Sequence, residues 1–305
     1  MAYYLVGTGG WSYFNVDSRL PLKAYSEVFN FVEVNYTFYE YPRIKQVENW
    51  RRIVPRDFTF SVRCHQDLTH RIGLKPVDEA FEVFYKMKVY CSILETSFLV
   101  LETPASQVLD ASGIREAKDF FASLKFDNNL KLIWEYRAPF SREVAKLMTE
   151  FDIVQIVDLS LNVPILESDL VYSRLFGKGK HNLYQFTDDE LLEIQSRADN
   201  SQAETVILAY HSARMNTDAA RFRMHQLTGK FPPVTSYFGV ESARAVLAED
   251  AKFPTNKSSL IGSQGWKVID LNKDRRVHLS DILELISDKT YNNLNAVTEE
   301  LKAVL

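Results

Sequence analysis

Eight short apolar segments of strand length alternate with helix-like segments over the first three quarters of the chain. Strands are expected at residues 4–8, 31–35, 58–63, 98–102, 132–136, 154–158, 171–176 and 205–210. Helices are expected at residues 21–29, 43–53, 76–94, 112–124, 141–151, 188–197 and 217–227, with a connection too short for a helix after the sixth strand. Strands separated by helices pair in parallel. About eight such units in about 230 residues predict a closed (β/α)8 TIM barrel.

A doubly wound open sheet is the structural alternative. Such a sheet usually has fewer strands and often carries a phosphate-binding G-x-G-x-x-G turn after the first one. Residues 7–12 here read G-T-G-G-W-S, so the spacing differs and Ser12 stands where the third glycine should be. The sequence therefore favours the barrel and argues against dinucleotide binding.

The last quarter of the chain has a different pattern. After Phe231-Pro232-Pro233, helices are expected near residues 241–250 and from residue 255, then a short strand at 266–271 and helical turns at 280–286 and 294–305. We predict two domains: a barrel that carries the site at residues 1–230, and a mainly helical C-terminal extension at residues 231–305 that packs on it.

Polar and charged residues recur where the expected strands end. In a TIM barrel these C-terminal strand ends form the mouth, where such proteins carry their chemistry. Strand alternation places apolar residues such as Val32, Leu99 and Trp134 toward the helices and the other set inward. That inward set comprises Glu33, Asn35, Arg63, Glu102, Glu135, Arg137, Asp158, Arg174 and His211. The sequence therefore predicts a polar pocket at the mouth.

Composition narrows the class of protein. The net charge of −4 argues against a surface that adheres broadly to nucleic acid. No run approaches the roughly 20 apolar residues of a membrane span, and the N-terminus lacks the pattern of a signal peptide. Cys64 and Cys91 lie in separate apolar segments, which is typical of reduced core thiols. We expect a cytoplasmic protein without membrane contact.

Several short motifs resemble one known family. Residues 7–13 (G-T-G-G-W-S-Y), 31–42 (F-V-E-V-N-Y-T-F-Y-E-Y-P), 55–63 (P-R-D-F-T-F-S-V-R), 69–70 (T-H), 135–137 (E-Y-R) and 172–177 (Y-S-R-L-F-G) resemble, in order, signatures of the YecE-like TIM-barrel family, domain-of-unknown-function family 72. The chain departs from these signatures at Arg63, Glu102, Phe176 and residues 210–212. The resemblance implies a barrel fold and brings no established reaction with it.

Our leading hypothesis is an enzyme, hydrolytic or lyase-like, that acts on a small phosphorylated or carboxylated substrate. Arg63, Arg137 and Arg174 would bind the anion, because the planar guanidinium suits bidentate contacts with such groups. Glu135 would transfer protons, supported by Glu33, and His70 is a candidate general acid. Other expected substrate contacts are Asn35, Trp11, Tyr39, Glu102, Asp158 and His211.

Two alternatives remain open. The carboxylates Glu33, Glu102, Glu135 and Asp158 with His211 could bind a divalent metal, but neighbouring arginines would repel the cation, so no obligatory cofactor is predicted. Aromatic residues of the first two loops, among them Trp11 and Tyr39, could instead stack on a base. Stacking of this kind predicts a non-catalytic protein that binds nucleotides or nucleic acid. The net negative charge of the chain makes this hypothesis the less favoured one.

Overall fold

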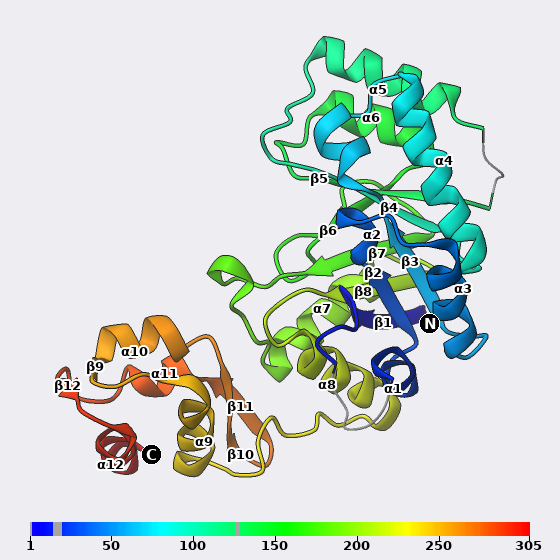
Figure 1. Ribbon diagram of the computed structural model, residues 1–305. Coiled ribbons are helices and arrows are strands. Elements are labelled where there is room, and N and C mark those ends of the chain that lie inside the picture. The colour runs from blue at the N-terminus through cyan, green and yellow to red at the C-terminus, as the bar shows by residue number, and fades with distance from the viewer. Residues whose placement is uncertain (1, 15–19, 126–128) are drawn as a thin grey trace. The chain divides into compact units, whose positions relative to one another are not determined.

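Eight parallel strands close into a barrel in sequence order in the computed structural model, which describes residues 2–14, 20–125 and 129–305 (Figure 1). The strands are β1 (Tyr3–Thr8), β2 (Phe31–Val34), β3 (Thr59–Arg63), β4 (Phe98–Thr103), β5 (Lys131–Tyr136), β6 (Val154–Val157), β7 (Leu170–Leu175) and β8 (Thr205–Tyr210). Strand β8 pairs with β1 in parallel and closes the barrel. The predicted (β/α)8 fold is confirmed.

Helices separate most of the strands. They are α1 (Pro21–Val28), α2 (Tyr36–Tyr39), α3 (Ile44–Ile53), α4 (Asp78–Ile93), α5 (Ala111–Ser123), α6 (Arg142–Glu150), α7 (Asp188–Asn200) and α8 (Met215–Thr228). As expected, β7 follows β6 without an intervening helix. A π-helix, η1 (Asp67–Ile72), follows β3, and a 3-10 turn, η2 (Lys180–Asn182), follows β7.

Local sequence explains where two of these helices begin. The Asp110 carboxylate accepts hydrogen bonds from the backbone N–H groups of Ser112 and Gly113 and caps α5. The Ser141 hydroxyl caps α6 by accepting from the Val144 N–H. Both caps satisfy backbone donors that have no partner within the helix.

Alternation along the strands fills the barrel interior. Apolar side chains there form one cluster, which includes Phe31, Val100, Ile133, Tyr172 and Ile207. Two residues further along β2, β4, β5 and β7, toward their C-terminal ends, the inward positions become charged, whereas Ala209 on β8 stays apolar. The strand register sets these polar residues side by side, as with Glu102 and Glu135 on β4 and β5. The filled interior therefore ends in a charged layer.

The described chain divides into two compact units, residues 1–175 with 197–210, and residues 176–196 with 211–305. The first holds all eight barrel strands. The domain boundary expected at residue 231 stays a prediction.

The second unit has its own core. Its helices include α9 (Val240–Asp250), α10 (Lys257–Gln264), α11 (Leu279–Leu283) and α12 (Leu294–Val304). Buried Leu247, Leu260, Ile269 and Leu301 belong to its apolar cluster. The strand expected at 266–271 is β10 (Val268–Asn272), which forms a hairpin with β11 (Arg275–His278). A second short pair joins β9 (Thr255–Asn256) to β12 (Thr290–Tyr291). The sequence analysis did not predict β11, because three of its four residues are arginine or histidine rather than apolar.

Candidate functional site

Arg174 lies at the centre of a charge network at the C-terminal ends of the barrel strands. Its Nη2 is 3.1 Å from Glu33 Oε1, and its Nη1 is 2.5 Å from Glu102 Oε2. The same Nη1 pairs with Glu135 Oε2. The side chain of Arg174 is only 2% exposed. One guanidinium from β7 thus joins carboxylates from β2, β4 and β5.

Glu102 is the second centre of the network. Its Oε2 is 2.5 Å from Arg63 Nη2, and its Oε1 is 2.8 Å from Arg137 Nη1. Arg137 also donates through Nε to Glu135 at 2.8 Å. The three carboxylates and three guanidiniums balance in formal charge, which is the condition for burying this many ions.

Burial and neighbouring charges shift the pKa values of Arg174, Glu135 and Arg63. Burial opposes the charge on Arg174, but Glu135, Glu33 and Glu102 outweigh it and hold the pKa of Arg174 well above its usual range. Burial would raise the pKa of Glu135, but Arg174 and Arg137 outweigh it, so the net shift is downward. Burial and the charge of Arg174 lower the pKa of Arg63. Glu135 is therefore an ionised carboxylate at neutral pH.

His70 borders this network from η1. Its Nε2 is 4.0 Å from Glu102 Oε1, and its Nδ1 is 3.0 Å from the Thr69 hydroxyl. The ring packs edge-on against Phe38. Burial lowers the pKa of His70 in spite of the Glu102 charge, so the imidazole is neutral near pH 7.

Aromatic residues near the network differ in their contacts and exposure. The Phe38 ring lies 3.7 Å from the Arg63 guanidinium carbon, a cation–π contact. Tyr39 is 60% exposed. Trp11 instead packs edge-on against Trp50, with the ring centroids 5.3 Å apart. Tyr39 is therefore more open to a ligand than Trp11.

The structure places the remaining predicted residues as follows. Asn35 accepts from Arg63 at 3.1 Å and donates to the Gly9 carbonyl at 2.7 Å. Asp158 accepts from the backbone N–H and the hydroxyl of Ser160, at 2.8 and 2.6 Å, and closes the turn after β6. His211 belongs to the second unit, where its ring centroid is 5.1 Å from that of Phe176. Asn35 thus joins the network directly.

Sequence reasoning missed Tyr172. Its hydroxyl donates to Glu33 Oε2 at 2.7 Å and lies 2.8 Å from the Ser61 hydroxyl. Burial and the Glu33 charge raise the pKa of Tyr172 well above its usual value. The signal that could have found it is alternation, since Tyr172 lies two residues before Arg174 on β7 and faces the same way.

Within the described ranges, no three His, Cys, Asp or Glu side chains are grouped closely enough to hold a metal ion. Among these residues no helix is long and apolar enough to cross a membrane.

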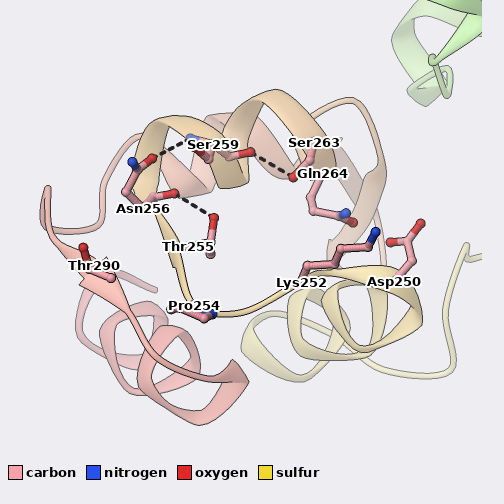
Figure 2. A pocket seen from close by; sticks show the side chains of 9 residues that line it. All are labelled: Asp250, Lys252, Pro254, Thr255, Asn256, Ser259, Ser263, Gln264 and Thr290. Carbon is pink, nitrogen blue, oxygen red and sulfur yellow. Dashed lines mark hydrogen bonds between the residues drawn. The ribbon is translucent and has the colours of Figure 1, made fainter.

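The second unit contains an open cavity of about 630 Å³ with a polar lining. Figure 2 shows its side chains, which include hydroxyl groups of Thr255, Ser259, Ser263 and Thr290 and amides of Asn256 and Gln264. Asn256 caps α10 by accepting from the Ser259 N–H at 2.8 Å. No residue predicted for the site lines this cavity.

Fold and site together define a (β/α)8 barrel protein with a charge network at the C-terminal mouth. The family described as "Protein of unknown function DUF72" matches residues 5–233, and the chain belongs to that family. The chain is 33% identical over 93 residues to the UPF0759 protein YunF of Bacillus subtilis, a stretch that spans 28% of this chain and 32% of that protein. The aligned stretch therefore covers about a third of the length of that curated relative.

Solved structures of the same family share the fold. A DUF72 family protein from Thermotoga maritima is similar with a TM-score of 0.60 and 18% identity, over 74% of this chain and 99% of that one. A DUF72 family protein from Enterococcus faecalis is similar with a TM-score of 0.55 and 15% identity, over 75% and 99% of the two chains.

Proposed function

We propose that the protein is an enzyme, hydrolase- or lyase-like, that uses the barrel mouth to bind a small phosphorylated or carboxylated substrate and transfer a proton. The observation that carries the proposal is the ion pair of Glu135 and Arg137 at the exposed edge of the network. The Arg137 side chain is 37% exposed, whereas that of Arg174 is 2% exposed. A ligand can reach an anion-binding group and a carboxylate base at the same place.

The roles follow from burial and charge. Arg137 binds the anion directly, and Arg63 and Arg174 hold the carboxylates of Glu102 and Glu135 in position through their ion pairs. Glu135 acts as the general base, because its carboxylate is ionised at neutral pH and lies beside the exposed Arg137. Glu33 holds the Arg174 guanidinium in place through their ion pair. His70, with a neutral imidazole, is the second proton-transfer group. Asn35, Tyr39 and Trp11 contribute to substrate contact.

A purely structural role explains this network less well. Burying ion pairs costs about as much free energy as their attraction returns, and apolar replacements are often neutral or stabilising. Six charged groups at one end of an already filled barrel therefore contribute little net stability. Proton transfer beside a bound anion gives this arrangement a chemical use.

The test is a turnover screen against phosphorylated and carboxylated metabolites, in which NMR of the small molecules measures their conversion. Glu135→Gln should lower kcat about 100-fold or more, the usual effect of losing a general base, while its unfolding curve stays cooperative. Glu143→Gln, on the exposed face of α6, is the matched control and should retain full activity. Full turnover by the Glu135→Gln variant would overturn the assignment of the base.

A second candidate function rests on exposed aromatic rings. Tyr13, which follows β1, and Tyr36 and Tyr39, which lie on α2 after β2, are 81%, 46% and 60% exposed. Such rings can stack on bases, which favours a non-catalytic protein that binds nucleotides or nucleic acid. In the same screen, salt-sensitive oligonucleotide binding without turnover of any compound would support this alternative.

A metal-dependent reaction is the third arm of the screen. Turnover that needs added divalent metal and stops on chelation would favour it over the metal-free proposal.

We also propose a cytoplasmic location, which the two buried free thiols, Cys64 and Cys91, support.

A further inference from the structure

A second cavity in the C-terminal unit has a different chemical character from the one in Figure 2. It is open, has a volume of about 330 Å³, and lies between the 179–184 segment and helix α10. Its lining includes the rings of Tyr184, Trp266 and His278. Small-molecule sites are concave and mostly apolar, with volumes from about 300 Å³ upward. This cavity has the size of a single ring system.

Hydrogen bonds hold the aromatic lining in place. The Tyr184 hydroxyl donates to Glu190. His278 Nε2 is 2.9 Å from the Gln185 carbonyl oxygen, and the Tyr184 and His278 rings lie 5.2 Å apart. Trp266 Nε1 donates to the Ser263 carbonyl at 2.9 Å. Because these rings are already oriented, a planar ligand loses little free energy in ordering them.

Gly262 opens one wall of the cavity. It lies inside α10, where a glycine weakens the helix relative to alanine. A Cβ atom added at Gly262 would meet nothing within 4 Å. The residue therefore does not serve close packing within the protein, and its lack of a side chain leaves space in the cavity.

Lys180 supplies charge at the cavity. It is exposed and lines the same space. In the part of the chain that the structure describes, no carboxylate lies within 4.0 Å of its ammonium group, whereas neighbouring Lys178 pairs with Glu190 at 3.0 Å. A cation beside aromatic rings suits a ligand that is planar at one end and negatively charged at the other.

We propose that this cavity binds a small aromatic anion: one planar ring system that carries a carboxylate or phosphate. The ring packs against Tyr184 and Trp266 over Gly262, and the anionic group contacts Lys180. This site is built by the second unit alone and is independent of the reaction proposed for the barrel mouth.

The test uses the four tryptophans of the chain as reporters. Full-length protein labelled with 5-fluorotryptophan is titrated with indole-3-carboxylate, phenyl phosphate and neutral indole and followed by ¹⁹F NMR. Trp266→Phe identifies the Trp266 resonance. We expect that resonance to move saturably with the two anions and those of Trp11, Trp50 and Trp134 to stay unchanged. An unchanged Trp266 resonance with both anions would overturn the site.

Three variants separate the parts of the proposal. Gly262→Leu fills the cavity and should weaken binding at least tenfold, whereas Ser258→Leu places the same side chain at an exposed position of the same helix and should leave binding unchanged. Lys180→Met should weaken binding of the anions about tenfold and leave binding of indole as it was. Equal affinity of Gly262→Leu and Ser258→Leu for the anions contradicts the location. Equal affinity of the unmodified protein for indole and indole-3-carboxylate contradicts the anion preference.

Discussion

At the scale of single residues, strand alternation explains which part of the site could be predicted. Glu33, Glu102, Glu135 and Arg174 follow inward apolar positions by two residues, and the period of a strand places them on the same side. Alternation says nothing of which guanidinium meets which carboxylate. Those pairs depend on side-chain lengths and on the stagger of five strands, so only the structure decided that Arg174 is enclosed while Arg137 is half-exposed.

Replacing Arg174 should therefore destabilise the folded protein. Arg174→Met leaves three carboxylates close together without their shared cation and should lower the free energy of unfolding by about 3–5 kcal/mol. Chemical denaturation of both proteins measures this. Arg142→Met, at an exposed position of α6, is the matched control and should change stability by no more than about 0.5 kcal/mol. If the two variants are equally stable, the network does not hold the charges as described.

At the scale of elements, the short helices were the hardest to foresee. Helix α2 has four residues and η1 is a π-helix of six, and these two carry Phe38 and His70 to the arginines. Neither is long enough to show a 3.6-residue period in the sequence. The π-helix ends at Gly73 in the left-handed region, with φ 82°, where its N–H bonds to the Leu68 carbonyl. Tertiary packing rather than local pattern forms both elements.

Helix α8 carries a buried carboxyl group that should make stability depend on pH. Asp218 accepts from the Phe186 N–H at 3.0 Å and from Arg221 at 3.1 Å. Burial nevertheless raises the pKa of Asp218 to about 7. The folded protein thus binds this proton more tightly than the unfolded chain, whose aspartate pKa is about 3.9. The contribution is present in full below about pH 4 and is lost as the pH rises toward 7.

Asp218→Asn should remove this dependence. Between about pH 4 and 7 the wild-type free energy of unfolding should include a downward slope of at most about 1.4 kcal/mol per pH unit, which the variant lacks. Denaturant unfolding at several pH values measures both slopes. Asp288→Asn, at an exposed position of the same unit, should keep the wild-type slope. Parallel curves for wild type and Asp218→Asn would show that Asp218 titrates alike in both states.

At the scale of the whole molecule, one apolar cluster of the described residues lies inside the barrel and another lies among α9–α12 and the β10–β11 hairpin. Both cysteines belong to the unit that contains the barrel. Cys64 follows β3 and Cys91 lies on α4, and both are buried free thiols. Burial raises the pKa of each thiol, so neither supplies a reactive thiolate in the folded protein.

Thiol labelling should consequently report opening of the barrel unit. A thiol reagent such as Ellman's reagent should label neither cysteine of the native protein within minutes and both in denaturant. Cys91→Ala should leave one slow thiol, with a labelling rate that rises with denaturant in step with the loss of structure. Rapid labelling of the native protein would contradict the burial of these residues.

The sequence by itself determined the order of the eight barrel strands and of the longer helices between them, the closed parallel barrel and the family. These features follow from local periodicity and from motifs of adjacent residues. Tertiary structure decided which charges meet, that Tyr172 holds Glu33, and that Lys180, Tyr184 and Trp266 line one cavity. Such groupings join residues far apart in the chain, and packing in three dimensions selects among many arrangements that the same local pattern allows.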